Sequence, residues 1–220
     1  MDWMAVALSL RLAALTTLIL CLIGLPLAYW LAMSNWRWKF LVEAVVALPL
    51  VLPPTVLGFY LLLALGPRSP LGQGWLALSG STLVFSFPGL LIASVLYSLP
   101  FAVRPFAVAF AAVDRKLVEA SWCLGVSRVA TFFRIVVPLA WPGVLAGMIL
   151  SFVHTIGEFG VVLMVGGNLE GVTRTLSISI YDDVQALEYG AAGRTSLALL
   201  MLSFVALALT HALQRRGWTS

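Results

Sequence analysis

The chain has 220 residues, of which 61% are hydrophobic and only 10% are charged, and its formal net charge is +4. A single soluble domain of this length cannot bury so much apolar surface, so the composition excludes an ordinary soluble protein and predicts an integral membrane protein. The small positive charge gives little support to nucleic-acid binding, and two cysteines in unrelated contexts argue against a disulfide framework.

The amino-terminal residues could be mistaken for a signal peptide. Residues 1–21 have no basic start, and Leu20 stands where cleavage before Cys21 would need a small residue. We therefore expect this segment to be retained as part of a membrane-spanning helix.

Five apolar runs are long enough to cross a bilayer, which takes about 20 mostly apolar residues in a helix. In chain order the runs cover residues 8–33, 41–65, 83–112, 137–165 and 196–213. We predict an all-α integral membrane protein with about five transmembrane helices, arranged as one domain over residues 1–220.

The positions of the 13 lysine and arginine residues indicate the orientation, because short cytoplasmic loops collect positive charge. With the amino terminus outside, four cations lie outside and nine lie on the cytoplasmic side. We therefore expect a multi-pass protein of the cell (plasma or inner) membrane with a cytoplasmic carboxyl terminus. The outer cations are Arg11, Arg68, Arg174 and Arg194, and the cytoplasmic ones are Arg37, Lys39, Arg104, Arg115, Lys116, Arg128, Arg134, Arg215 and Arg216.

The second apolar run contains three prolines, Pro49, Pro53 and Pro54, followed by Thr55. Prolines remove backbone donors and interrupt a helix, and broken helices at membrane depth often line a transport pathway. Pro53, Pro54 and Thr55 are therefore candidates for a pathway or gate, although a simple packing kink is the alternative.

Residues 115–138, between the third and fourth runs, combine basic residues with apolar positions at mainly three- and four-residue spacings. This pattern predicts one or two short amphipathic helices on the cytoplasmic face, with Gly125 turning the chain between them. From the pattern alone, the segment could be an interfacial anchor.

The fourth run carries a carboxylate, Glu158, and several small or polar residues at membrane depth. A carboxylate there is costly and by default functional or paired, so we expect a hinge or gate in which Glu158 accepts backbone amide hydrogen bonds or pairs with Arg174. His154 lies one turn away, but two ligands without a third do not predict a metal site. The pathway or gate candidates of this run are Ser151, Thr155, Gly157, Glu158 and Gly160. The two hydroxyls could instead bond their own helix backbone.

The segment 168–189 is less apolar and predicts a short amphipathic helix at the outer surface. It could dock a partner protein or simply cover the bundle.

The order Glu119-Ala120-Ser121, Gly125 and, after a nine-residue gap, Ile135 to Pro138 resembles the EAA loop of ABC importer permeases. Ser121 and Val137 depart from the pattern by small changes. The resemblance implies a type I ABC importer permease fold in which the loop, about residues 114–136, forms a coupling helix held by an ATPase subunit. It carries the coupling role to Glu119, Ala120, Ser121, Gly125 and Pro138.

The sequence contains no Gly-x-x-x-x-Gly-Lys-Ser/Thr phosphate loop. We expect no cofactor and no catalytic residue in this chain, with ATP and Mg²⁺ bound by a separate ATPase. The chain is thus expected to be a transport subunit and not an enzyme.

Residues 48–58 and 157–160, together with 166–168 and 173–175, resemble the molybdate branch of these permeases. The resemblance implies a homodimer of this subunit, two ATP-binding subunits, and an extracytoplasmic oxyanion-binding protein that delivers molybdate. Sulfate, thiosulfate or tungstate transport is the alternative, since sulfate permeases have a similar Gly-Glu-Phe-Gly sequence. An intramembrane enzyme or a channel is a more distant alternative, which would leave the coupling pattern without a purpose.

Overall fold

The computed structural model describes the backbone of residues 2–216 and the side chains of residues 2–212. Arg215 and Arg216, which entered the charge count, lie outside the described side chains. The helices in chain order are α1 (Trp3–Met33), α2 (Lys39–Val51), α3 (Pro54–Leu65), α4 (Pro70–Ser79), α5 (Phe87–Ala111), α6 (Arg115–Cys123), α7 (Arg128–Thr131), a π-helical turn η1 (Phe132–Val136), α8 (Val137–Gly157), α9 (Gly160–Gly166), α10 (Leu176–Gln185) and α11 (Tyr189–Arg216).

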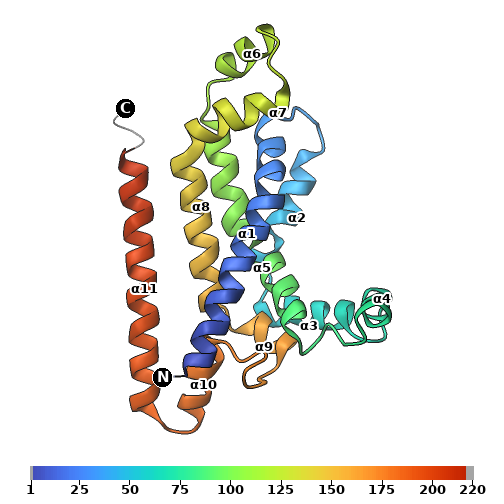
Figure 1. Ribbon diagram of the computed structural model, residues 1–220, viewed down its shortest axis with the longest axis vertical. Helices are drawn as coiled ribbons and strands as arrows, with labels where there is room; N and C mark the ends of the chain where they lie inside the picture. The colour runs from blue at the N-terminus through green and yellow to red at the C-terminus, as the bar shows by residue number, and fades with distance from the viewer. Residues whose placement is uncertain (1, 217–220) are drawn as a thin grey trace.

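Four continuous helices of the described chain are long and apolar enough to cross a membrane, and they confirm the first, third, fourth and fifth predicted spans. They are α1, α5, the continuous helix Arg128–Gly157 formed by α7, η1 and α8, and residues Tyr189–Ala212 of α11. Figure 1 shows these long helices running roughly side by side. The chain is a multi-pass, all-α membrane protein.

The second predicted span is broken, as its prolines indicated. α2 and α3 are long and apolar enough to form one span only when taken together, and they meet at an angle of 112°. Pro49 remains inside α2, whereas Pro53 precedes α3 and Pro54 occupies its first turn. A proline in the first turn costs little because that backbone N–H has no partner within the helix. The break therefore lies at Pro53 and Pro54.

The fourth predicted span is present, but both of its predicted bounds, residues 137 and 165, are wrong. The helix begins earlier, at Arg128, and it ends at Gly157. Glu158 has extended backbone angles and a second short helix, α9, begins at Gly160. The apolar run continues through the break, so hydropathy alone could not locate it.

Close helix packing in the centre depends on glycines. Phe106 of α5 is fully buried and lies against Gly24 of α1 and Gly147 of α8. A Cβ atom added at Gly147 would lie 2.6 Å from the Phe106 ring, and one at Gly143 would lie 2.4 Å from the Ala109 Cβ. Small residues let helices approach closely in membranes, so these glycines bring α1, α5 and α8 into contact.

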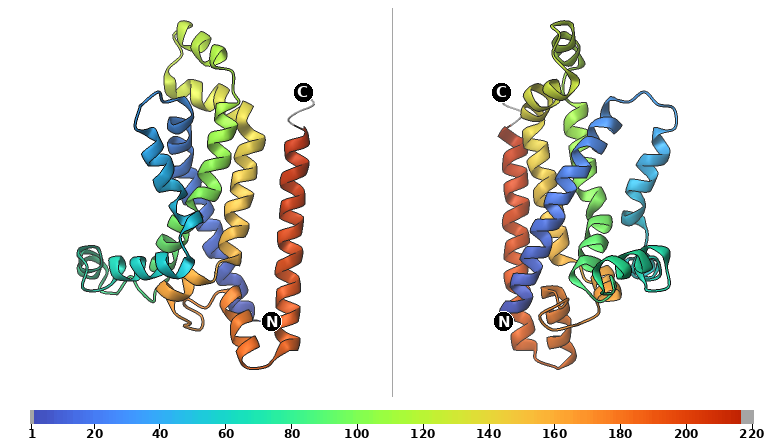
Figure 2. Two further views of the ribbon diagram at one scale, coloured as in Figure 1. Left: turned by 180° about the vertical axis from the view of Figure 1, so that it is seen from behind. Right: turned by 45° about the vertical axis from the view of Figure 1, so that its right-hand side comes forward.

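The two ends of the bundle carry different elements. α6 projects beyond one end, whereas the start of α1 and α10 lie at the other end, and α11 returns to the end that carries α6 (Figures 1 and 2). The short helices α3 and α4 extend sideways near the end that carries α10. The end that carries α6 is called the coupling end below and the end that carries α10 the outer end, after the orientation expected from the sequence.

Candidate functional site

The coupling segment, residues 114–136, forms two short helices joined by a tight turn. Asp114 begins α6 by accepting a hydrogen bond from the Lys116 backbone N–H (2.9 Å). Gly125 has a φ of +79°, in the left-handed region that favours glycine, and its N–H donates to the Trp122 carbonyl (2.9 Å). The predicted role of Gly125 as the turn between two amphipathic pieces is confirmed.

A pair of buried hydroxyls holds α6 against α7. Ser121 Oγ and Thr131 Oγ1 lie 2.8 Å apart, and both residues are almost fully buried. Thr131 Oγ1 also donates to the Ser127 carbonyl (3.0 Å), so the Ser121 hydroxyl must be the donor in the pair. Ser121 therefore lies inside the coupling segment, where it fixes the position of α6 on the helix that follows.

The outward face of α6 is available for contact. Glu119 and Ala120 are exposed, and so are the large apolar side chains of Leu117, Trp122 and Leu124. Leu124 is 84% exposed at the tip of the segment. An apolar surface with a carboxylate on a helix that projects from the bundle is typical of a protein contact.

Pro138 lies apart from that face. It is exposed in the first turn of α8, directly after the π-helical turn. The helix from Arg128 to Gly157 has 30 residues, so at 1.5 Å per residue it runs about 45 Å from the coupling segment to the outer half of the bundle.

The broken ends of the second and fourth spans meet at the far end of that helix. α3 and α9 pack against each other. A Cβ atom added at Gly160 would lie 2.6 Å from the Pro54 Cβ, and one added at Gly58 would lie 2.8 Å from the Met164 Cβ. The structure thus brings together Pro54 and Gly160, two residues that the sequence assigned to a gate from separate runs.

Glu158 connects α8 to α9. Its side chain is buried, with 7% exposed, and Oε1 accepts a hydrogen bond from the Val161 backbone N–H (2.7 Å). Of the two alternatives that the sequence left open, backbone amide bonding is therefore confirmed. A carboxylate at the start of a helix satisfies backbone donors that would otherwise be unpaired.

Arg174 has other partners than Glu158. Its Nε donates to Asn168 Oδ1 (2.8 Å), and the guanidinium lies 3.6 Å from Asp182 and 3.9 Å from Glu170. Pairing of Arg174 with Glu158 is thus wrong. The predicted helix of the outer segment is present as α10, and this polar cluster attaches it to the loop after α9.

The remaining gate candidates are either buried or exposed. Ser151 and Thr155 are buried and donate to carbonyls of their own helix, Met148 O (3.0 Å) and Ser151 O (2.8 Å). Their hydroxyls therefore serve helix packing, and Thr155 also bonds Ser98 of α5 (2.9 Å). In contrast, Pro53, Thr55 and Gly157 are exposed.

His154 belongs to the same packing network. Its Nδ1 lies 3.0 Å from Ser98 Oγ, and its ring stacks on Phe101 with the centroids 3.7 Å apart. Among the described residues, no group of three or more His, Cys, Asp or Glu side chains could hold a metal ion.

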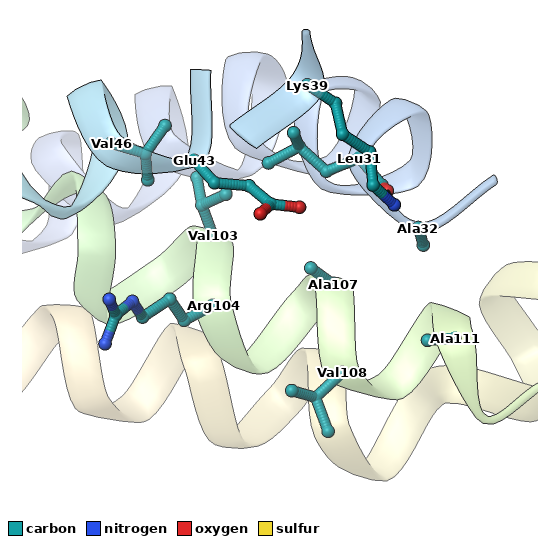
Figure 3. A pocket seen from close by; sticks show the side chains of 10 residues that line it. All are labelled: Leu31, Ala32, Lys39, Glu43, Val46, Val103, Arg104, Ala107, Val108 and Ala111. Carbon is teal, nitrogen blue, oxygen red and sulfur yellow. The ribbon is translucent and has the colours of Figure 1, made fainter. Parts of the chain in front are cut away.

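Arg104 lies within a membrane-spanning helix. The charge count assigned it to the cytoplasmic side although it stands in the third apolar run, and the structure places it inside α5, seven residues before the helix ends at Ala111. It lines a cavity of about 470 Å³ together with Lys39 and Glu43 of α2 (Figure 3). An arginine within an apolar run was the signal that could have identified it.

Comparison with known proteins agrees with this architecture. Residues 24–218 match the family described as "Binding-protein-dependent transport system inner membrane component". The chain is 50% identical over 206 residues to the molybdenum transport system permease protein ModB of Azotobacter vinelandii, covering 94% of this chain and 91% of the relative. It is 37% identical over 208 residues to the protein of the same name from Escherichia coli K12, covering 93% and 91%.

Solved structures share the fold at low identity. A bacterial alginate ABC transporter in complex with an alginate-bound periplasmic protein has a chain with a TM-score of 0.72 at 16% identity, covering 96% of this chain and 76% of that one. The methionine ABC transporter MetNI in an inward-facing conformation gives 0.67 at 16% identity, covering 96% of both chains.

Proposed function

The chain belongs to the family of binding-protein-dependent transport system inner membrane components, and we propose that it is the permease subunit of an ATP-driven importer of molybdate. The similarity to molybdenum transport permeases over nearly the whole chain carries this proposal. As a member of that family, the chain is a transport subunit and not an enzyme. Tungstate, sulfate or thiosulfate would be the alternative cargo.

The partners follow from the family and from the coupling segment. The working unit is a homodimer of this chain with two ATP-binding subunits at the coupling end and an oxyanion-binding protein at the outer end. ATP and Mg²⁺ are held by the ATP-binding subunits. The exposed Glu119, Ala120 and Leu124 of the coupling segment support the contact with the ATPase, because they offer a carboxylate and apolar surface beyond the bundle.

The helix Arg128–Gly157 transmits movement from one end to the other. The Ser121–Thr131 hydrogen bond joins α6 to the start of this helix, and Glu158 joins its far end to α9. A displacement of α6 by the ATPase therefore moves α8 as a lever and shifts α9 against α3. This gives alternating access, in which packed helices move as rigid pieces around a central path.

The gate lies where α9 meets α3. Gly160 and Gly58 let the backbones of α9 and α3 approach closely. A small rotation of α9 therefore separates the two helices or brings them together, which opens or closes the gate. The broken backbone is tolerated because it is packed in protein or faces a water-lined path. With the ATP-binding subunits at the coupling end, the amino terminus lies outside the cell and the carboxyl terminus lies in the cytoplasm.

Vesicles that contain the chain with its ATPase and its delivery protein would test the function. We expect molybdate-loaded delivery protein to stimulate ATP hydrolysis and molybdate uptake. Stimulation by sulfate-loaded and not by molybdate-loaded delivery protein would reject molybdate as the cargo.

The coupling contact has a matched control. Ala120→Arg places a bulky cation on the outward face of α6 and should abolish co-purification of the ATPase. Ala186→Arg makes the same change at an exposed position after α10, at the outer end, and should leave the ATPase bound. Equal retention of the ATPase by both variants would contradict the coupling role of α6.

A further inference from the structure

Arg104 is a charged side chain well inside a membrane-spanning helix. It is exposed on the surface of the chain, and α5 continues for seven more residues to Ala111. At 1.5 Å per residue, the Arg104 backbone lies about 10 Å inside the coupling end of the helix. Charged residues at such depth avoid lipid and face the bundle interior or a water-filled cavity. The face of α5 that carries Arg104 therefore does not face lipid.

Arg104 does not escape to the nearby surface. Long basic side chains near a helix end usually extend toward the closer interface. In Figure 3 the Arg104 guanidinium points away from Ala111, which is the direction of the membrane interior. Helical side chains lean toward the amino-terminal end of their helix, and for α5 that end is the outer one. The charge consequently lies deeper than its own backbone.

The Arg104 guanidinium has no hydrogen bond, ion pair or aromatic ring as a partner within the described part of the chain. Other arginines do have such partners: Arg115 reaches the Ala32 carbonyl (3.5 Å), and Arg11 lies over the Phe87 ring (4.5 Å). An unpaired cation that faces a water-filled cavity at this depth is available to bind an anion from outside the chain.

The cavity beside Arg104 contains two further charges. Lys39 lies at its coupling end, where its Nζ is 3.4 Å from the Leu31 carbonyl. Glu43, one turn along α2, extends its carboxylate between α2 and α5 (Figure 3). No ion pair in the described chain joins Glu43 to either cation. The two cations and one carboxylate among the lining residues give the cavity a net positive charge, with the Arg104 guanidinium pointing away from Lys39 and Glu43 (Figure 3).

We propose that Arg104 and this cavity form a binding site for a tetrahedral oxyanion on the inner half of the transport path. The inference rests on the proposed function and names the residue by which this chain attracts its anionic cargo. Arg104 meets the anion at depth and Lys39 receives it near the coupling end. Glu43 keeps the site from holding the anion too tightly, since a transport site must also release its cargo.

Coulomb's law sets the size of the effect. A dianion about 6 Å from one positive charge in water-like surroundings is stabilised about tenfold relative to a neutral site. We therefore expect Arg104→Gln to lower molybdate uptake about tenfold in the reconstituted importer. Arg104→Lys keeps the charge and should retain most of the uptake.

Two further variants serve as controls. Arg68→Gln removes an exposed cation from the loop between α3 and α4 and should leave uptake unchanged. Glu43→Gln in combination with Arg104→Gln distinguishes cargo binding from an ion pair formed with a second copy of the chain. If the double variant regains full uptake, Arg104 serves only to neutralise Glu43 and the proposal is overturned. If uptake remains low, the proposal is supported.

A chemical rescue avoids dependence on folding of the charge-deleted protein. Arg104→Cys, with Cys21 and Cys123 replaced by serine, is assembled with its partners and treated with methanethiosulfonates that attach either an ammonium or a sulfonate group. The ammonium should restore uptake at least severalfold, and the sulfonate should not. Failure of both charged reagents to label the introduced thiol would show that it faces lipid or packed protein, and this would overturn the proposal.

The failure of this inference can be distinguished from the failure of the proposed function. Labelling of the introduced thiol depends on the water-lined cavity and not on the identity of the cargo. If the unmodified importer carries sulfate and not molybdate, but Arg104→Gln abolishes that transport, the assigned cargo is wrong while the oxyanion site stands. If molybdate uptake is normal in Arg104→Gln, the site is wrong while the function stands.

Discussion

The hydrogen bond between Ser121 and Thr131 predicts an asymmetric response to removal of either hydroxyl. Ser121→Ala removes the donor, but Thr131 still donates to the Ser127 carbonyl. Only an accepted bond is lost, which costs about 0.5–1.5 kcal/mol. Thr131→Val keeps the shape of the side chain but leaves the buried Ser121 hydroxyl without an acceptor and the Ser127 carbonyl without that donor. Leaving buried polar groups unsatisfied costs about 1–3 kcal/mol.

Amide hydrogen exchange of α6 measures these costs as changes in local opening. Ser121→Ala should speed the exchange of the α6 amides about two- to tenfold, and Thr131→Val about five- to one-hundred-fold, since about 1.4 kcal/mol corresponds to a factor of ten. In the double variant the two changes should not add, because Ser121→Ala removes the group that Thr131→Val leaves unsatisfied.

Thr55→Val, at an exposed position of α3, provides the control and should leave α6 exchange unchanged. Equal effects of Ser121→Ala and Thr131→Val, or strictly additive effects, would refute the assigned direction of the hydrogen bond. No effect of either variant would refute the attachment of α6 to α7 through this pair.

Three further predictions concern single positions. Gly147→Ala should destabilise the chain by about 1–3 kcal/mol, because the added methyl group overlaps Phe106. Gly74, inside α4, has open space around it, so Gly74→Ala should leave the melting temperature in detergent equal or higher. A melting temperature lowered by Gly74→Ala alone would contradict this packing. Gly125→Ala should cost about 1 kcal/mol of local stability in the coupling turn, seen as faster α6 exchange, because its φ of +79° strains any residue with a Cβ. Glu158→Ala should destabilise α9 by about 1 kcal/mol, seen as faster amide hydrogen exchange in α9, because it removes the acceptor of the Val161 N–H. Glu158→Gln retains an accepting oxygen and should leave the exchange slower than Glu158→Ala does. Equally fast exchange in both variants would show that the charge of Glu158, and not its hydrogen bond, stabilises α9.

The sequence was sufficient to predict that the spans exist and that Gly125 turns the chain, because both depend on local composition and spacing. The continuous helices lie where the apolar runs have the required length. Gly125 turns the chain between the two short amphipathic helices of the coupling segment. The break at Pro53 and Pro54 was also predictable, since proline in the first turn of a new helix is favourable.

The errors occurred where tertiary partners decide the outcome. Hydropathy could not locate the break at Glu158, because the residues on both sides are apolar and the break depends on a side chain bonding the Val161 amide. The partner of Arg174 could not be chosen without the position of α10, which brings Asp182 beside it. Arg104 was counted with the cytoplasmic loops although it lies inside α5, because the charge rule treats every basic residue as part of a loop.

The sequence predicted individual residues of the gate but not which of them contact one another. Pro54 and Gly160 come from runs that are far apart in the chain, and only the packing of α3 on α9 shows that they touch. Ser151 and Thr155 lie in the same run as Gly160, yet their hydroxyls bond their own helix. The residue types were enough to locate the region of the gate. Which side chains point into it could be known only from the fold.

The transmission of movement along the helix Arg128–Gly157 is tested most directly by distances between spin labels in the assembled importer. One pair of labels is placed at Ala120 in the two copies of the proposed homodimer, and a second pair at the exposed Leu169, in the loop after α9. On binding of a non-hydrolysable ATP analogue, we predict that the distance between the Ala120 labels shortens while that between the Leu169 labels lengthens in the same transition. A change at Ala120 that leaves the Leu169 distance unaltered would contradict the lever.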